Sequence, residues 1–348
     1  MIAVTSRIQF TVADESHDAG MRRLLRDVPM PGSIKVSLQR EPSYFAAAGA
    51  EGAEHHAIVA LEGAEVVGMG SLSARDRFLN GQSARVGYLG GLRLASAVQG
   101  RFDIVRRGYA LLKQLSRQIG VEAIFTTIAT DNERAISLLE RRIPGMPTYA
   151  PVGELVTLLL RVNGRNAKSD DPLGHVSSRA LIERVNESMS QFQFAPRWSE
   201  SECTKSDFAI LTNSNGVDAC AAFWDQRHFK QAVVTHYPIH LKVLAALGRL
   251  PRVGHPLSQA FVSHLTCPME KPELLTHLID RLASRASAAN IDMLCIGLDS
   301  RDRRLKMLQR SYSARSYRTR LYRVSWEDAH ESLPHLDGRL VYPEVALL

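Results

Sequence analysis

The sequence predicts an α/β (α+β) protein built from two tandem domains, each with a mixed, mostly antiparallel central sheet flanked by helices. Three observations support this prediction. Apolar runs of strand length alternate with segments of helical periodicity, the order of these elements repeats after about half the chain, and a polar segment separates the two copies. We place the first domain at 1–162, the linker at 163–178 and the second domain at 179–348.

Composition agrees with a globular protein of two domains. The chain has 348 residues, of which 45% are hydrophobic and 23% charged. Its net charge of +7 favours anionic partners such as a nucleotide cofactor. Because the sequence has neither a signal-peptide pattern nor an apolar run of membrane-spanning length, we expect a cytoplasmic protein with no membrane partner.

Several kinds of chemistry find no support in the sequence. The four cysteines are widely spaced, form no CxxC pair and have no histidine at ligand spacing, which argues against a metal site and against a disulfide framework. The chain also lacks the GxSxG, GxxxxGK[ST], HExxH and paired-glycine dinucleotide motifs. These absences remove hydrolase, nucleotidase, metalloprotease and dehydrogenase interpretations.

The N-terminal segment predicts antiparallel strands and helices that precede the strand beginning at 86. Alternating polarity predicts a first strand at 7–13, and a capped amphipathic pattern predicts a helix at 14–25. A short helical region is expected within 32–52. Two apolar runs joined by Glu62-Gly63 then predict a hairpin over 57–72.

The most informative stretch follows at 86–142. A strand with paired glycines at Gly90-Gly91 predicts a bulge or a close backbone approach. After the turn Gln99-Gly100-Arg101, helical periodicity predicts a helix over 101–119, and a dense apolar run predicts a buried strand over 123–130. The first turn of a helix has free N–H groups and partial positive charge, so this arrangement can hold a phosphate.

This segment resembles the acetyl-CoA-binding core of the GNAT N-acetyltransferase superfamily, in which a Gln/Arg-x-x-Gly-x-Gly/Ala turn holds the pyrophosphate of coenzyme A. The resemblance implies acetyl-CoA as the cofactor. The residues that it assigns to cofactor binding are Leu92, Arg93, Leu94, Gln99, Gly100 and Arg101, with Asn132 and Ala135 from the second motif, Asn-x-x-Ala. Phe102 and Ile104 depart from the small residues that the family prefers. Asn132 is equally well explained as a helix cap.

The resemblance also implies an acid and a base for acetyl transfer to an amine. Many family members place a tyrosine just inside the second helix, where this chain has Leu139. Tyr149 is the nearest substitute for the acid and Tyr88 is a rival, while a structural role is open for either tyrosine. For the base, Glu154 is one candidate and solvent is another.

The second half repeats the order of elements seen in the first. A strand at 260–265, a helix at 274–289, a strand at 293–298 and a helix capped by Asp299 follow one another, and Asp299 lies 168 residues after Asp131. We expect 219–224 and 232–235 to be central strands of this copy. The copy has Pro268 and Glu270 where a phosphate-binding turn would lie, which predicts a degenerate, non-catalytic domain.

Three functions of different classes therefore stand. The leading one is an acetyl-CoA-dependent N-acetyltransferase acting on a small-molecule or peptide amine, with a homodimer compatible with the sequence. The second is an inactive relative that binds coenzyme A or a metabolite as a sensor. The third is a nucleic-acid-associated protein using the basic, tyrosine-containing segment 301–323. For that segment we favour a solvated helix followed by an edge strand, so nucleic acid is not the expected partner.

Overall fold

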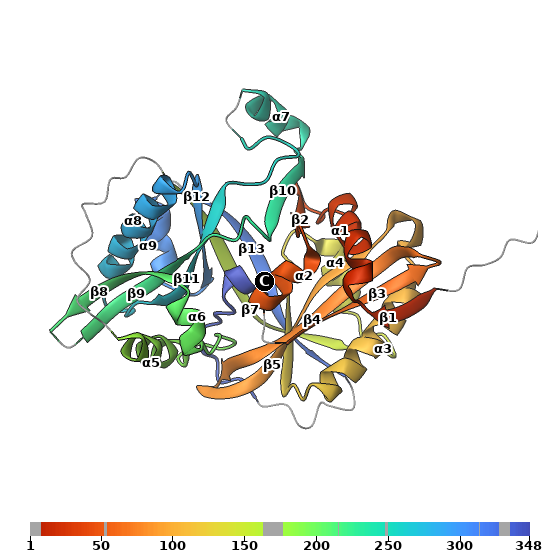
Figure 1. The fold of residues 1–348 in the computed structure, drawn as a ribbon, viewed down its shortest axis with the longest axis horizontal. Helices are drawn as coiled ribbons and strands as arrows, with labels where there is room; N and C mark the ends of the chain where they lie inside the picture. Colours follow the sequence, from red (N-terminus) through yellow and green to blue (C-terminus); the bar gives the residue numbers. More distant parts are fainter. Residues whose placement is uncertain are drawn as a thin grey trace, which may run out of the picture.

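The computed structural model describes residues 8–51, 54–162, 177–214, 216–247, 250–312, 314–326 and 335–348 (Figure 1). Of the linker expected at 163–178, only Ser177 and Ser178 are among the described residues. The domain boundary therefore stays a prediction. No helix in the described part of the chain is long and apolar enough to span a membrane.

The elements of the N-terminal half follow the predicted order. They are β1 (Gln9–Val12), η1 (Glu15–His17), α1 (Asp18–Asp27), β2 (Lys35–Gln39), α2 (Tyr44–Glu51), β3 (Glu54–Glu62), β4 (Glu65–Leu79), β5 (Gln82–Leu94), η2 (Ser96–Val98), α3 (Phe102–Gln118), β6 (Ala123–Ala129), α4 (Glu133–Leu139) and β7 (Thr148–Arg161). The hairpin β3–β4 turns at Gly63, whose φ of +63° is a conformation that glycine adopts without strain.

The C-terminal half contains a second set of similar elements. They are α5 (Ser178–Met189), α6 (Glu200–Thr204), β8 (Asp207–Asn213), β9 (Gly216–Trp224), β10 (Gln231–His236), α7 (Ile239–Ala246), β11 (Gln259–Thr266), α8 (Pro272–Ala288), β12 (Met293–Asp299), α9 (Arg304–Ser311), β13 (Ala314–Ser325) and η4 (Val345–Leu347). Asp299 does not cap α9 as expected; its carboxylate instead accepts from Arg301 and from the backbone N–H of Val341.

One sheet of eleven strands runs through both halves of the described chain, in the order β1-β3-β4-β5-β6-β13-β7-β12-β11-β9-β8. Only the pairs β5–β6 and β11–β12 are parallel, and the other pairs are antiparallel. The prediction of a mixed, mostly antiparallel sheet flanked by helices is therefore confirmed. Counted from β3 and from β8 toward the centre of the sheet, both halves have two antiparallel pairs, then one parallel pair, then one antiparallel pair.

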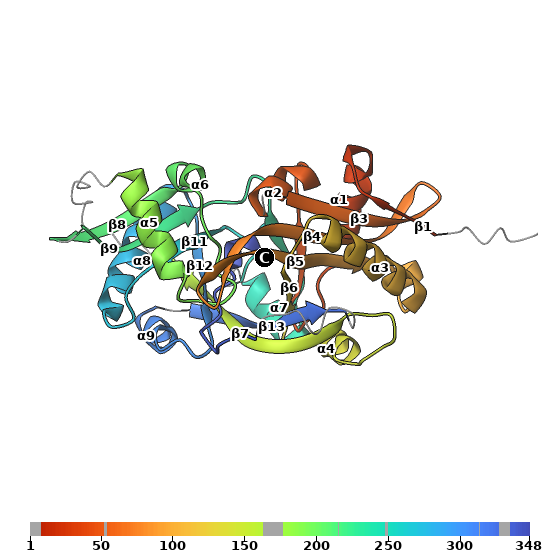
Figure 2. The same cartoon turned by 90° about the horizontal axis from the view of Figure 1, so that it is seen from below.

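The last strand of each half pairs with the other half. β7 is hydrogen-bonded to β12, and β13 is hydrogen-bonded to β6 and to β7 along its length. Figure 2 shows β7 and β13 side by side between the two halves. The expectation of an edge strand within 301–323 is wrong, because β13 occupies the centre of the sheet. Its arginines are accommodated there by ion pairs, such as Arg318 with Glu154 and Arg320 with Glu140.

Amphipathic helices cover the sheet. α3 buries Ile104, Tyr109, Leu112 and Leu115, and its apolar face packs against β3 and β4. α8 packs in the same way against β8, β9 and β12. Burial of one leucine side chain stabilises the fold by about 2 kcal/mol, so these helices are held mainly by their apolar faces.

The strand expected at 232–235 lies outside the main sheet. It forms β10, which pairs with β2 of the N-terminal half in a separate two-stranded sheet. The prediction that it is a central strand is therefore wrong. Val234 is buried in a small cluster with Val36, Tyr237 and Leu250. The apolar side chains of β10 are therefore buried away from the main core. The β2–β10 sheet links the two halves a second time.

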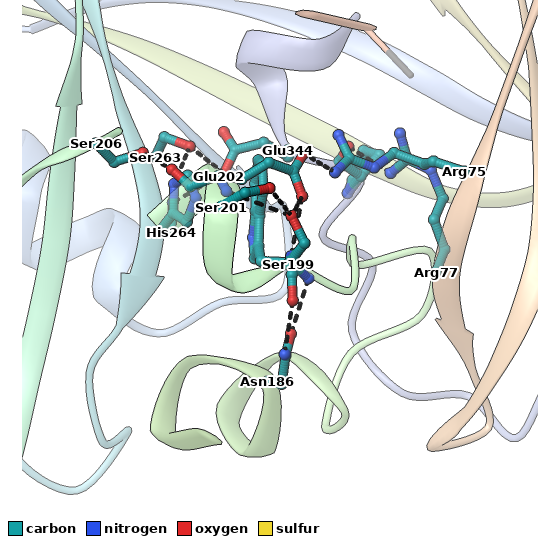
Figure 3. A network of polar contacts seen from close by, with 12 residues as sticks. Arg75, Arg77, Asn186, Ser199, Ser201, Glu202, Ser206, Ser263, His264 and Glu344 are labelled. Atoms are coloured by element: carbon teal, nitrogen blue, oxygen red, sulfur yellow. Dashed lines mark hydrogen bonds and ion pairs between the residues drawn. The ribbon is translucent and has the colours of Figure 1, made fainter. Parts of the chain in front are cut away.

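A buried polar network joins β4, β11 and the C-terminal segment (Figure 3). Arg77 donates from Nη1 to the carbonyl oxygens of Phe194 at 2.7 Å and Pro343 at 2.8 Å. Glu344 accepts from the Ser263 hydroxyl and from the backbone N–H of His264, both at 3.2 Å. Because burial removes water from the Glu344 carboxylate, its pKa rises to about 7.

The Glu344 carboxyl makes stability depend on pH. Its folded pKa lies above its unfolded value of 4.5, so its contribution is fully present below about pH 4.5 and is lost as pH rises through about 7. Glu344→Gln, which is always neutral, removes this dependence. We expect the free energy of unfolding of the wild type to fall, relative to Glu344→Gln, by about 2–3 kcal/mol between pH 4.5 and 8. Urea unfolding across that range measures the difference.

Glu200→Gln provides the control, since the Glu200 side chain is exposed to water in the folded state as well as in the unfolded state. The two glutamine variants are compared with the wild type at each pH. A wild type and Glu344→Gln that change in parallel with pH would contradict a raised pKa for Glu344.

Candidate functional site

The strands β5 and β6 separate after a short parallel contact. They pair only between Val86–Tyr88 and Ala123–Phe125, although β5 continues to Leu94 and β6 to Ala129. At the point of separation the Tyr88 hydroxyl is hydrogen-bonded to the Thr127 hydroxyl at 3.1 Å. The separation opens a gap in the sheet between two strands that begin as neighbours.

A bulge in β5 lies beside this gap. The register between β4 and β5 shifts between Met69 and Ser71, and Gly91 has a φ of +65°. The bulge predicted from the paired glycines is confirmed. Because β5 has lost its partner on the β6 side here, backbone groups of the bulge lie where a bound molecule can reach them.

A cavity of about 2490 Å³ passes through the gap. It is lined by Tyr88 and Thr127, whose strand positions share one face of the sheet, and by Leu112 and Ile128, which belong to the core on the opposite face. Side chains from both faces can line one cavity only where the sheet is open. The cavity also extends beneath the β2–β10 sheet toward β7, β12 and β11.

The predicted phosphate-binding turn lies on the wall of this cavity. Gln99, Gly100 and Arg101 all line it, and Gly100 has a φ of +86° with open space where a side chain would begin. α3 begins directly after Arg101, whose side chain does not cap the helix. The first N–H groups of a helix have no partner within it, so this end of α3 is suited to an anion.

The charges at the start of α3 partly cancel. Arg101 donates to the Asp103 carboxylate at 2.7 Å, and this hydrogen bond lowers the pKa of Asp103. The Asp103 carboxylate would by itself repel a phosphate, and the guanidinium of Arg101 offsets that repulsion. Both side chains are exposed and can rearrange around a ligand.

The two bulky residues do not close the turn. Phe102 is 39% exposed and contributes to the cavity wall without filling it. Ile104 is buried in a cluster with Ile8, Val67 and Val98, which belongs to the core under α3. These two departures from the small residues of the family pattern therefore leave the cavity open.

The end of β5 contributes the next predicted residues. Leu92, Arg93 and Leu94 line the cavity, and Arg93 donates to the carbonyl oxygen of Leu92 at 2.8 Å. Burial lowers the pKa of Arg93 from its usual value. Its Nε is buried without a hydrogen-bond partner among the described residues, so the guanidinium retains an unused donor.

Asn132 and Ala135, the two residues of the Asn-x-x-Ala motif, also line the cavity and contact each other. The Asn132 side chain accepts from the backbone N–H of Ala135 at 3.2 Å and is the N-cap of α4. The capping role that the sequence allowed is thus present. A role in cofactor binding stays a prediction.

Tyr149 lies in the aromatic core beneath α3. Its hydroxyl donates to the Tyr109 hydroxyl at 2.5 Å, and its ring meets that of Tyr322 edge-on. Burial raises its pKa well above the usual value. Tyr149 reaches the cavity lining, but its proton is held by Tyr109.

Glu154 points away from the cavity. On β7 the alternate residues Leu155, Thr157 and Leu159 line the cavity, so Glu154 lies on the opposite face of the strand. There it forms an ion pair with Arg318. This placement gives no support to Glu154 as the base.

Tyr317 of β13 is a site residue that sequence reasoning missed. It lies opposite Thr157 and lines the same cavity as Tyr88. The protein that surrounds its hydroxyl raises the pKa of Tyr317 to about 12, although 47% of the residue is exposed. The sequence analysis expected an edge strand in this segment, but nothing local in the sequence showed that this strand crosses into the other half.

Comparison with known proteins agrees with the fold. Residues 22–143 match the model of the acetyltransferase (GNAT) family. No curated protein sequence matches the chain. The match shows that residues 22–143 are similar to a GNAT acetyltransferase domain, and it supports acyl transfer as the class of reaction.

Solved structures share the fold across both halves. A GCN5-related N-acetyltransferase from Sphaerobacter thermophilus has 12% identity and a TM-score of 0.52, over 81% of this chain and 82% of that one. N-myristoyltransferase from Saccharomyces cerevisiae with bound myristoyl-CoA has 12% identity and a TM-score of 0.57, over 93% and 83% of the two chains. At such identities the likeness concerns the fold alone.

The cap at Asn132 provides a test of the local structure. Asn132→Ala leaves the N–H of Ala135 without its acceptor, so we expect the free energy of unfolding to fall by about 1 kcal/mol. Asn132→Asp restores an oxygen acceptor and is expected to remain close to the wild type. Urea unfolding distinguishes them, and equal stability of the alanine variant and the wild type would show that the cap contributes nothing.

Proposed function

We propose that this protein is an acetyl-CoA-dependent N-acyltransferase with one working cofactor site, in the N-terminal half. The observation that carries the proposal is the cavity that passes between β5 and β6 beside the start of α3. This arrangement offers an anion site for the diphosphate and a path through the sheet for the thioester arm. Arg93, Gln99, Gly100 and Arg101 would line the cofactor.

The chemistry needs a polarised carbonyl and two proton transfers. Backbone groups at the β5 bulge would stabilise the oxyanion that forms when an amine attacks the thioester. The thioester C–S bond then breaks, the amine nitrogen gives up a proton, and the thiolate gains one. Because Glu154 lies on the face of β7 opposite the cavity lining, we assign that step to water in the cavity.

We assign the acid role to Tyr88 in preference to Tyr149. The Tyr88 hydroxyl lies where the two strands separate, next to Thr127, whereas the Tyr149 hydroxyl donates to Tyr109. Tyr149 remains the candidate that the sequence indicated. Its buried pair with Tyr109 supports a structural role.

Titration of the protein with acetyl-CoA tests cofactor binding. A ligand that binds only the folded state raises its melting temperature with concentration. We expect such a rise for the wild type and its loss in Gly100→Trp, because an indole at this position would fill the space at the start of α3.

Gly120→Trp is the matched control for this titration. Gly120 also has a positive φ, +67°, and open space around it, but it lies beyond the other end of α3 and outside the cavity lining. No rise in the wild type would overturn the proposal. A rise that survives in Gly100→Trp would show that the turn is not the phosphate site.

Substitution of the two tyrosines separates their roles. Tyr88→Phe is expected to lower the turnover number for thiol release about 100-fold, since general acid catalysis typically contributes at least that much. Tyr149→Phe is expected to lower the free energy of unfolding by about 1 kcal/mol, through loss of the hydrogen bond to Tyr109, with little change in turnover.

Thiol release from acetyl-CoA with a panel of amines, and urea unfolding of both variants, provide the measurements. The reverse pattern, a large kinetic effect at Tyr149 and none at Tyr88, would restore the assignment made from the sequence. Tight binding of acetyl-CoA without turnover on any amine would favour the inactive sensor.

A further inference from the structure

Three arginines line the end of the cavity farthest from α3. Arg161 ends β7, Arg315 begins β13, and Arg252 lies between α7 and β11. Arg315 is opposite Leu159, which makes Arg161 its diagonal neighbour on the same face of the sheet, about 7–8 Å away by general strand geometry. We call these three residues the arginine cluster.

Arg252 is connected to the other two arginines through Tyr237. The charge of Arg315 opposes the rise that burial causes in the pKa of Tyr237. The Tyr237 hydroxyl in turn donates to the carbonyl oxygen of Pro251 at 3.0 Å, next to Arg252. The arginine cluster thus converges from β7, β13 and the connection that precedes β11.

The charges of the arginine cluster have no partners among the described residues. No ion pair or side-chain hydrogen bond joins any of the three to another described group, whereas Arg227, Arg301 and Arg304 each pair with an aspartate. In the described lining near β7, β12 and β11 the acidic groups are Asp292 and the terminal carboxylate of Leu348, which accepts a hydrogen bond from Lys230. Positive charge is therefore in excess at this end.

The distance from the gap to the arginine cluster follows from the strand register. Leu321 of β13 is opposite Thr127 at the gap, and Arg315 lies six residues away on the same strand. At about 3.4 Å per residue the separation is about 20 Å. An extended peptide of about six residues spans this distance.

We propose that the arginine cluster binds an oxyanion, a carboxylate or a phosphate, carried by the acceptor about 20 Å from its reacting amine. This inference rests on the proposed function and names the class of its acceptor: an elongated, peptide-like amine with an anionic group at its far end. Guanidinium groups hold such oxyanions through paired, charge-assisted hydrogen bonds.

Titration with small anions tests the binding site directly. Succinate and inorganic phosphate are added separately to the wild type, to the double variant Arg161→Gln/Arg315→Gln, and to Arg310→Gln. Arg310 is exposed on α9 outside the cavity lining, so its substitution controls for the loss of a positive charge away from the cavity. We expect saturable thermal stabilisation of the wild type and Arg310→Gln, and at least tenfold weaker binding in the double variant.

The succinate and phosphate arms show which oxyanion is preferred. Equal binding of both anions by the wild type and the double variant would overturn the proposal, as would an absence of saturable binding to the wild type. Because these titrations need no cofactor, they decide the inference even if acetyl-CoA fails to bind and the proposed function is wrong.

A peptide series tests the length. Glycine-led peptides of two, four and six residues, each with a free C-terminal carboxylate or a C-terminal amide, serve as acceptors with acetyl-CoA. We expect the carboxylate to lower KM at least tenfold at six residues only, and the double variant to lose this advantage. An advantage that is equal at all lengths, or that persists in the double variant, would refute the assigned position of the oxyanion while leaving acetyl transfer intact.

Discussion

The exchange of the last strands between the two halves is the constraint on which the rest of the structure depends. β13 fills the place between β6 and β7, and β7 in turn pairs with β12. Because an unpaired strand edge inside a core would leave backbone N–H and C=O groups unsatisfied, neither half completes its sheet without the other. The same exchange brings Arg315 and Tyr317 of the C-terminal half into a cavity that starts in the N-terminal half.

The two halves have the same arrangement of strands, but they differ in what occupies the region where the parallel strands separate. Each has a parallel pair of strands that separates after three paired residues, and each has a break in register with a positive φ, at Gly91 in β5 and at His264 in β11. Gly91 leaves room for a bound molecule. The His264 ring instead stacks on Trp198 at 3.6 Å, and η4 packs over β11 and β12, so protein occupies the corresponding region of the second half.

Local patterns predicted local structure well. The periodicity of α3, the dense apolar run of β6, the Glu62-Gly63 turn and the Asn132 cap each depend on neighbouring residues. The errors concern contacts between distant parts of the chain: the pairing of β10 with β2 and the central place of β13. The structure also places Glu154 on the face of β7 opposite the cavity lining, which the sequence could not show. A strand shows its face only once its partners are known, since a shift of one residue exchanges the two faces. The acid assignment changed for the same reason, because Tyr109 and Tyr149 meet only through tertiary packing.

The position of the unpaired charges connects the two halves functionally. The buried Arg304 is held by the Asp302 carboxylate, because an unpaired charge in a confined space is costly. The arginine cluster escapes this cost by remaining in contact with the solvent of the cavity, where an incoming oxyanion can replace water. The C-terminal half, whose corresponding region is covered by its own C-terminal segment, contributes β10, β12 and β13 to the walls of this cavity. The proposed single cofactor site and the proposed acceptor surface therefore both depend on the same strand exchange.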